Sequence, residues 1–282
     1  MNDTAAELPR IGLALSGGAV RGIAHIGILQ ALEDGGITPY CLSGTSVGAL
    51  IATLYAFGTP VGKIQQLAAE LKWLQISHFT LSKLGLLSNE EMGRFVEQII
   101  GKANIEDAVR PLAIVCTDIG TGGKVILRKG EAAKAVMAST CLPGIFIPVR
   151  MEDRLLVDGG LVEDVPISPL RPMGAEVVVA AHLSAGATYA RPEDIMDVVI
   201  NAFDIAIDLN IKGQIADADV VIKTRLAAYN RRDLDQFSGL YAAGYQAGAR
   251  SIEPIRRALR GHPRRRPCFF SRFKQALFPA RE

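Results

Sequence analysis

The sequence predicts an α/β fold in which a mostly parallel central sheet has helices on both faces. Three observations lead to this fold class. Short apolar runs rich in β-branched residues alternate with longer stretches of helical periodicity, glycine-rich turns separate them, and no proline-, glycine- or serine-rich linker divides the 282 residues. We therefore expect one domain over residues 10–260, with short tails over 1–9 and 261–282.

The expected elements follow one another along the whole chain. The strands are short apolar runs suited to a buried sheet: Arg10–Leu15, Pro39–Leu42, Pro111–Thr117, Gly123–Leu127, Leu155–Val157, Ala175–Ala181 and Asp219–Lys223. The helices are stretches of 3.6-residue periodicity bounded by glycine or by capping residues: Val20–Asp34, 47–57, Val61–Leu74, Ser88–Ile100 and Ile195–Ile211.

Composition excludes several classes of protein. The chain is 49% hydrophobic and 21% charged, which is typical of a globular protein and not of a disordered one. Its net charge of +2 is too small to indicate a nucleic-acid partner. The four cysteines, Cys41, Cys116, Cys141 and Cys268, lack metal-ligand spacing, so we expect no metal. With no signal peptide and no apolar run long enough to span a membrane, we expect a cytoplasmic location.

A serine, Ser46, lies between two glycines at the point where the second expected strand ends and a helix begins. Gly44-Thr45-Ser46-Val47-Gly48 fits the G-x-S-x-G pattern of a nucleophile elbow, in which the glycines allow a tight turn that exposes the serine at a helix N-terminus. The N–H groups there favour negative charge beside the reacting atom. The alternative is that Ser46 or Thr45 only caps the helix.

A serine nucleophile needs a base, and the sequence offers two kinds of candidate. His182, at the end of an expected strand, is the histidine placed correctly for a Ser–Asp–His chain order. Asp158 ends another strand directly before Gly159 and Gly160, where backbone can approach closely, and it could take the Ser46 proton itself. Asp-Gly is also common in type I turns, so a structural role for Asp158 stays open.

The turn after the first strand offers backbone N–H donors. Ser16–Gly22 (SGGAVRG) lies between a strand and a helix and matches neither a P-loop nor a dinucleotide-binding turn. Its N–H groups have little side-chain obstruction and could hold the oxyanion of a tetrahedral intermediate, at about 3 kcal/mol per donor. A phosphate cradle and a plain tight turn are the other interpretations.

Four motifs in a fixed order give the chain a resemblance to the patatin-like phospholipases, which are serine hydrolases of lipid acyl esters. They are SGGAVRGIAHIGIL (16–29), GTSVGA (44–49), ASTCLPGIFIPV (138–149) and LVDGGLVEDVPI (156–167). The resemblance covers roughly residues 10–225, and the chain is similar to the small bacterial members, which carry no added domains.

The resemblance implies a three-layer α/β/α fold and a Ser–Asp dyad, with Ser46 as nucleophile and Asp158 as base. It implies an oxyanion hole from the backbone of Gly17, Gly18 and Ala19. The family has glycine at the third of these positions, and alanine still supplies an N–H unless φ there must be positive. The remaining motif positions support these turns: Arg21, interpreted as structural, Gly22, Gly44, Gly48 and Gly159. The resemblance implies no cofactor, and its substrate is a phospholipid or another fatty-acyl ester.

The C-terminal residues combine aromatic and basic side chains. Residues 262–282 carry six Lys or Arg and one acid, a net charge of +5, whereas the rest of the chain sums to about −3. Phe269, Phe273 and Leu277 would share one helical stripe, and with the clustered bases they suit an anionic membrane. We expect peripheral contact with the inner membrane surface; alternatively, these aromatics dock on the protein's own core.

Two other functions remain open from the sequence. The first is a soluble esterase or thioesterase that uses the same Ser46, which a response to micelles and a chain-length preference would separate from a phospholipase. The second is a non-catalytic regulatory or lipid-sensing protein on the same fold. Retention of both Ser46 and Asp158 argues against this second alternative.

Overall fold

The computed structural model describes residues 9–70, 78–79, 84–85, 87–183, 189, 191–227, 229 and 236–262. Residues 1–8 and 263–282 lie outside the described residues. The predicted tails, including the stripe of Phe269, Phe273 and Leu277, therefore stay predictions, as do the domain boundaries.

Strands and helices alternate along the chain, as the sequence predicts. The strands are β1 (Ile11–Leu15), β2 (Cys41–Thr45), β3 (His78–Phe79), β4 (Leu87–Ser88), β5 (Leu112–Asp118), β6 (Gly123–Leu127), β7 (Val149–Met151), β8 (Arg154–Asp158), β9 (Val177–His182) and β10 (Val220–Lys223). The helices are α1 (Ile23–Asp34), α2 (Val47–Ala56), α3 (Val61–Glu70), α4 (Glu90–Ile100), α5 (Ala132–Ser139), α6 (Gly160–Glu163), α7 (Ile195–Gln214) and α8 (Phe237–Gly261), with 3₁₀ turns η1 (Ala19–Gly22) and η3 (Ile105–Asp107). The helix expected from Ser88 begins two residues later, because Ser88 pairs in β4.

One mixed sheet organises the molecule. Its strand order is β10-β9-β1-β2-β5-β8-β7, with β6 also paired to β5. The neighbours from β10 to β5 run parallel, whereas β6, β7 and β8 pair antiparallel. The parallel strands end at one edge of the sheet, which is where ligands bind in open α/β folds. The predicted mostly parallel sheet is confirmed.

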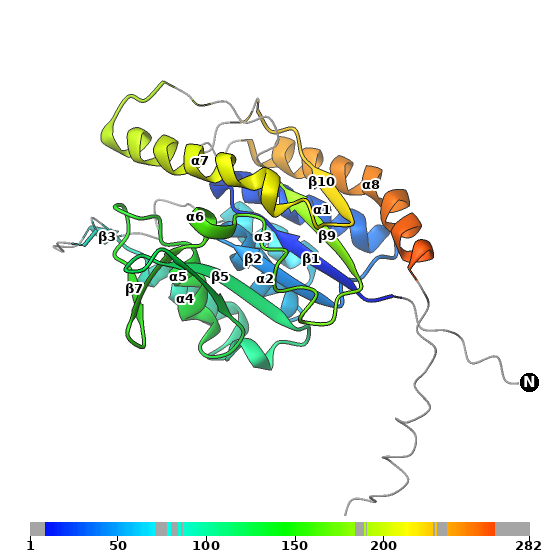
Figure 1. Cartoon of the computed structure of the whole chain (residues 1–282), viewed down its shortest axis with the longest axis horizontal. Helices are drawn as coiled ribbons and strands as arrows, with labels where there is room; N and C mark the ends of the chain where they lie inside the picture. Colours follow the sequence, from blue (N-terminus) through cyan, green and yellow to red (C-terminus); the bar gives the residue numbers. More distant parts are fainter. Residues whose placement is uncertain are drawn as a thin grey trace, which may run out of the picture.

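Alternate residues of the parallel strands pack into two separate cores, one on each face of the sheet. Leu13 and Leu15 join a large core with the helices α1, α2, α3 and α8. Ala14, between them, joins a smaller core with Val165 and Leu170 of the segment that follows α6. Figure 1 shows α7 lying beside α6, and these two helices are packed together. Helices therefore cover both faces, as predicted.

The long helix α8 is the main element that the sequence does not predict. It packs closely along α1 through glycines: a Cβ on Gly244 would lie 1.9 Å from the Ala24 carbonyl oxygen, and a Cβ on Gly27 would lie 2.1 Å from the Tyr241 carbonyl oxygen. Only glycine permits backbones to approach so closely. Among the described helices, α8 included, none combines the length and the apolar composition that a membrane crossing requires.

Candidate active site

Strands β2 and β8 meet end to end along one edge of β5. Thr45, the last residue of β2, pairs with Val115. Asp158, the last residue of β8, pairs with Cys116, the next residue of β5. Val115 also pairs with β6, so β6 holds the other edge of β5 and leaves β2 and β8 to share this one. The turn that carries Ser46 therefore adjoins Asp158.

Ser46 has the backbone of a nucleophile elbow. Its φ is 54° and its ψ is −129°, a conformation that costs a non-glycine residue about 1–3 kcal/mol. The flanking glycines permit close packing: a Cβ on Gly44 would lie 2.4 Å from the Gly48 carbonyl oxygen, and one on Gly48 would lie 2.2 Å from the Leu15 carbonyl oxygen. Ser46 is half-buried, whereas its neighbours on both sides are buried.

The helix-cap interpretation of this turn is wrong for both hydroxyls. Ser46 occupies the N-cap position of α2, but its side chain makes no capping hydrogen bond. The Thr45 hydroxyl instead donates to the carbonyl oxygen of Glu163 at 2.8 Å. The Ser46 hydroxyl is thus left for another role.

A second serine, Ser139, anchors the elbow. The Ser46 N–H donates to the Ser139 Oγ at 2.9 Å, and that hydroxyl donates to the Val115 carbonyl oxygen at 2.7 Å. Ser139 is fully buried at the end of α5. The sequence motif ASTCLPGIFIPV contains Ser139, but nothing in its spacing indicates that this hydroxyl reaches the elbow.

Asp158 is buried and only partly hydrogen-bonded. Its side chain is 1% exposed, and its Oδ1 accepts the Gly160 N–H at 2.8 Å. Its backbone N–H donates to the Cys141 carbonyl oxygen at 2.8 Å, which fixes the end of β8. Among the described residues, Oδ2 has no partner in full hydrogen-bonding geometry, although the Ser46 hydroxyl is near enough to act on the carboxyl.

Burial raises the pKa of Asp158 to about 7. The Ser46 hydroxyl and the Gly160 N–H oppose this by stabilising the charged carboxylate, whereas the negative charge of Asp204 on α7 raises the pKa further. A carboxyl with a pKa near neutrality is poised to accept a proton and give it back. The type I turn that would explain Asp158 structurally does not account for this buried, unsatisfied oxygen.

The glycine-rich turn lies directly against Ser46. A Cβ on Gly17 would lie 3.4 Å from the Ser46 Cβ and 2.5 Å from Asp164 Oδ1. The Gly17 N–H is already engaged, because it donates to Asp164 Oδ1 at 3.1 Å and to the Asp164 carbonyl oxygen at 3.3 Å. The described residues supply no acceptor for the Gly18 N–H. The Gly17 N–H is thus engaged within the fold, whereas the Gly18 N–H is left for another acceptor.

The backbone at Gly18 and Ala19 has an unusual conformation. Gly18 has φ 147°, and Ala19 has φ 49° although it carries a side chain. Ala19 is exposed and opens the turn η1, whose first N–H groups have no intrahelical acceptor. The positive φ that the family's glycine would adopt without strain is thus adopted here by alanine.

The remaining motif residues brace these turns. Arg21 is 3% exposed, and its Nη2 donates to the Tyr229 carbonyl oxygen at 3.0 Å, which supports its structural interpretation. A Cβ on Gly22 would lie 2.3 Å from the Val47 side chain, and one on Gly159 would lie 2.3 Å from the Val115 carbonyl oxygen. Both glycines are therefore required by close packing.

Neither buried histidine near the turn completes a triad. His25 bonds the Ser16 carbonyl oxygen through Nε2 at 2.8 Å, so the ring acts as a donor and is neutral, since burial lowers its pKa to about 4. The ring nitrogens of His182 have no hydrogen-bond partner among the described residues, and burial lowers the pKa of this ring too. A Ser–Asp–His arrangement through His182 is not assembled.

Three of the cysteines are buried inside the fold. Burial raises the pKa of the Cys41 thiol to about 11, that of Cys141 to about 12, and that of Cys116 well above its usual value. They are therefore inert thiols, whereas Cys268 lies outside the described residues. Within the described ranges, no three His, Cys, Asp or Glu side chains gather closely enough to bind a metal ion.

An apolar cavity of about 230 Å³ lies beside Asp158. Its lining is entirely apolar and comes from the segment after Cys141, from α6 and from α7: Leu142, Pro143, Ile145, Leu161, Val199, Ile200, Ala202, Phe203 and Ala206. It borders the acid closely, because a Cβ on Gly160 would lie 3.2 Å from both Asp158 Oδ1 and the Phe203 ring. An apolar chain is the natural occupant of such a cavity.

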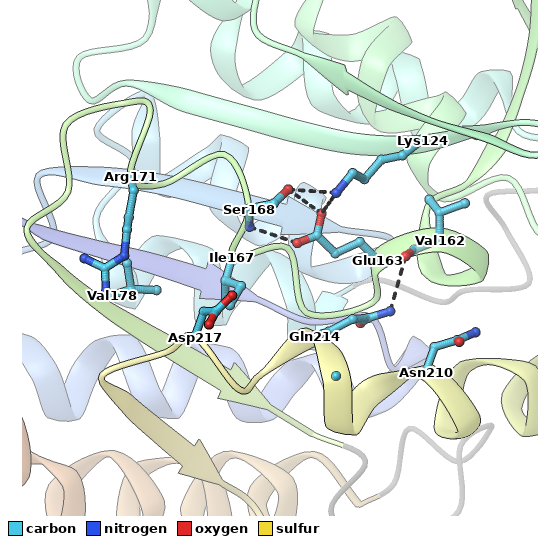
Figure 2. Close-up of a pocket in the computed structure, with 11 residues that line it drawn as sticks. Lys124, Val162, Glu163, Ile167, Ser168, Arg171, Val178, Asn210, Gln214 and Asp217 are labelled. Carbon is cyan, nitrogen blue, oxygen red and sulfur yellow. Dashed lines mark hydrogen bonds and ion pairs between the residues drawn. The ribbon is translucent and has the colours of Figure 1, made fainter.

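A larger cavity of about 730 Å³ is lined by both polar and apolar side chains, and several of its polar groups bind one another (Figure 2). Glu163 accepts from Lys124 Nζ at 2.9 Å and from the Ser168 hydroxyl at 2.7 Å. Gln214 at the end of α7 accepts the Asp164 N–H at 3.0 Å. These hydrogen bonds fix the segment that carries Asp164. Because Asp164 accepts the Gly17 N–H, they also help to position the Gly17 turn.

Comparison with known proteins identifies the family of this chain. The family model described as patatin-like phospholipase matches residues 13–171. An uncharacterized NTE family protein of Mycobacterium tuberculosis is 32% identical over 182 residues, which is 62% of this chain and 49% of that protein. The lysophospholipase NTE1 of Cryptococcus neoformans is 33% identical over 182 residues, covering 62% of this chain and 11% of that protein. The chain thus matches about half the length of the first relative and about a tenth of the second.

Two solved structures share the fold at low sequence identity. VipD from Legionella pneumophila superposes with a TM-score of 0.54 at 14% identity, covering 88% of this chain and 67% of that one. ExoU from Pseudomonas aeruginosa, solved in complex with SpcU, superposes with a TM-score of 0.51 at 13% identity, covering 92% and 55%. These likenesses support the fold.

Proposed function

The chain belongs to the patatin-like phospholipase family, and from this premise we propose that it hydrolyses fatty-acyl esters with Ser46 as nucleophile and Asp158 as base. The observation that carries the proposal is the strained elbow of Ser46 adjoining a buried carboxyl whose pKa is about 7. A lipid ester hydrolase is the class that the family supports. The dyad, its mechanism and its preferred substrate are our inference.

Acylation begins when Asp158 accepts the Ser46 proton as the Ser46 Oγ bonds to the ester carbonyl carbon. The carbonyl π electrons move to oxygen, and the resulting oxyanion is held by the N–H groups of Gly18 and Ala19. When the carbonyl re-forms, the bond to the alcohol oxygen breaks. Asp158 gives its proton to this leaving alkoxide, which departs as the alcohol, and Ser46 remains acylated.

Deacylation repeats these steps with water. Asp158 accepts a proton from water as the water oxygen bonds to the acyl carbon, and the same two N–H groups hold the oxyanion. The bond to Ser46 Oγ then breaks, Asp158 returns the proton to Oγ, and the fatty acid is released. One carboxyl acts alternately as base and acid, which suits a pKa near neutrality.

The apolar cavity supports a fatty-acyl substrate over a small polar ester. Its lining residues include Leu161 and Phe203, which lie next to the proposed base, so an acyl chain in the cavity would hold its ester group near Ser46. A soluble long-chain thioester would fit the same cavity. Stimulation of hydrolysis by micellar lipid would favour the phospholipase, and its absence would favour the soluble thioesterase.

Labelling with a fluorophosphonate probe tests the proposed nucleophile directly. Such a probe phosphonylates an activated serine and loses fluoride, leaving a stable mass increase on the peptide that contains Ser46. We expect labelling of the wild type at Ser46, no labelling of Ser46→Ala, and much slower labelling of Asp158→Asn. Labelling at another serine, or equal labelling of Asp158→Asn, would contradict the dyad.

A further inference from the structure

Helix α7 carries an exposed apolar stripe along its outer side. We define the α7 stripe as five exposed residues at spacings of three and four: Ile195, Val198, Ala202, Ile205 and Leu209. The two end residues are 71% and 80% exposed, and no polar side chain interrupts the series. At 100° per residue the stripe occupies about 80° of the helix circumference and about 21 Å of its length.

The α7 stripe is continuous with the apolar cavity. Ala202 belongs to both, and Val199 and Ala206, which also line the cavity, follow next around the helix. Beyond them Phe203 contacts the site of Gly160, beside Asp158. One uninterrupted apolar surface therefore leads from the outside of α7 to the proposed catalytic acid.

The side of α7 beyond the stripe is net acidic, with Asp197, Asp204 and Asp208 against the single base Lys212. Asp197 and Asp208 are half-buried on the side of α7 away from the cavity, and Tyr189 donates a hydrogen bond to Asp208. No basic residue stands among the five stripe positions. An apolar stripe with acidic neighbours suits a surface that is apolar beneath and has no net negative charge.

We propose that α7 docks on the surface of zwitterionic lipid, with the α7 stripe buried among the outer acyl chains. Soluble proteins rarely expose a continuous apolar series of this kind without a binding role. A single row of five side chains can bury much less surface than the roughly 800 Å² per partner that a stable protein interface buries. A lipid surface needs no such area, because each apolar side chain enters it independently.

Docking would give the stripe a function in substrate delivery. With α7 lying in the interface, the apolar cavity opens toward the acyl chains, and a chain can pass from lipid to cavity without crossing water. This part of the inference rests on the proposed hydrolase function. The docking itself does not, because the stripe residues Val198 and Leu209 line neither the cavity nor the dyad.

The test compares vesicle binding of two matched double variants of the full chain. Val198→Glu/Leu209→Glu places two charges on the stripe. Val109→Glu/Ile126→Glu places two charges on exposed apolar residues that lie together elsewhere on the protein. Both are made in a Ser46→Ala background, so that sedimentation with phosphatidylcholine vesicles measures binding without hydrolysis.

We expect the stripe variant to bind vesicles at least about tenfold more weakly than the parent, and the control variant to bind within about twofold of it. With Ser46 restored, both variants should hydrolyse a soluble short-chain ester at the parent rate, which shows that the fold is intact. Vesicle binding by the Ser46→Ala parent, together with no hydrolysis of any ester by the wild type, would leave docking supported and overturn the hydrolase function.

Three results would overturn docking through α7. The first is equal vesicle binding by the parent, the stripe variant and the control variant, or no binding by any of them while ester hydrolysis continues. The second is binding that requires anionic lipid and is lost on deletion of 263–282 but not in the stripe variant. The third is a parent dimer that the stripe variant converts to monomers, which would make the stripe a contact between two copies.

Discussion

The backbone N–H of Ser46 donates to the Oγ of Ser139 at 2.9 Å, and the Ser139 hydroxyl in turn donates to the Val115 carbonyl oxygen. The strained elbow is therefore held by a side chain from α5 in addition to its own strand and helix. Two neighbouring strands, β2 through the Ser46 turn and β5 through Val115, are fixed to each other by one hydroxyl.

Replacing Ser139 with alanine should loosen the elbow. The substitution removes the acceptor of the Ser46 N–H and one donor to the Val115 carbonyl oxygen, so we expect the free energy of unfolding to fall by about 1–3 kcal/mol. We also expect kcat to fall more than KM rises, because the acyl chain still binds. Urea denaturation and ester kinetics measure the two effects.

Ser251→Ala is the matched control for this substitution. Ser251 is also buried, but its hydroxyl donates within α8 to Ala247, far along the chain from the elbow. We expect Ser251→Ala to leave kcat unchanged. Equal losses of kcat in the two variants would show that Ser139 has no particular connection with the site.

The pH dependence of activity should follow the Asp158 carboxyl. Its pKa of about 7 means that the ionised base accumulates only as the pH rises through neutrality, so kcat/KM should increase along an acid limb with an apparent pKa near 7. A pH–rate profile over about pH 5–9 measures this limb. A limb near pH 4 would indicate an ordinary exposed carboxylate instead of this buried one.

The same carboxyl should make the fold less stable as the pH rises. The pKa of Asp158 is raised from 3.8 to about 7, so the folded protein holds this proton more tightly than the unfolded chain does between these values. Its contribution to stability is therefore complete below about pH 4 and decreases as the pH rises toward 7. Asp158→Asn, which cannot ionise, should lack this decrease and be more stable than the wild type above pH 7. Urea denaturation of both proteins at several pH values tests this, and parallel curves would contradict it.

Ala19 tests the backbone of the oxyanion turn without removing an N–H. Its φ of 49° is easily adopted by glycine and disfavoured for a β-branched residue. We expect Ala19→Gly to keep both activity and stability, and Ala19→Val to lower kcat at least about tenfold by moving the turn. Full activity of Ala19→Val would mean that this N–H does not contact the oxyanion.

Filling the apolar cavity should change the acyl-chain preference. Ala206→Phe adds a ring to the wall formed by Phe203 and Leu161, so we expect long-chain p-nitrophenyl esters to lose activity while acetyl and butyryl esters keep it. Ala242→Phe, on an exposed position of α8, is the control and should alter neither. An unchanged chain-length profile in Ala206→Phe would place the acyl chain elsewhere.

The sequence predicts those parts of the site that are local in the chain. The elbow around Ser46 follows from its two glycines and its position between a strand and a helix, and Asp158 follows from a strand end before two glycines. The contacts of Ser139 and of Asp164 with these turns could not be predicted, because they depend on the register of strands far apart in the sequence.

The fold shows the same division between local and long-range information. The apolar runs of β1, β5 and β9 indicate buried strands by composition alone. Helix α8 escapes prediction because Gly244 and Gly248 on its face toward α1 and Pro254 in its interior are residues that ordinarily interrupt a helix. The α7 stripe escapes prediction for a different reason, since apolar residues occupy both the inner and the outer side of α7.

The most direct test of the Ser–Asp account compares hydrolysis of a chain-length series of p-nitrophenyl esters and of mixed phospholipid micelles by the wild type, Ser46→Ala and Asp158→Asn. We expect hydrolysis by the wild type, with a loss of at least about a thousandfold in each folded variant. Near-normal turnover by Asp158→Asn would contradict the dyad, and near-normal turnover by Ser46→Ala would contradict the nucleophile on which the account rests.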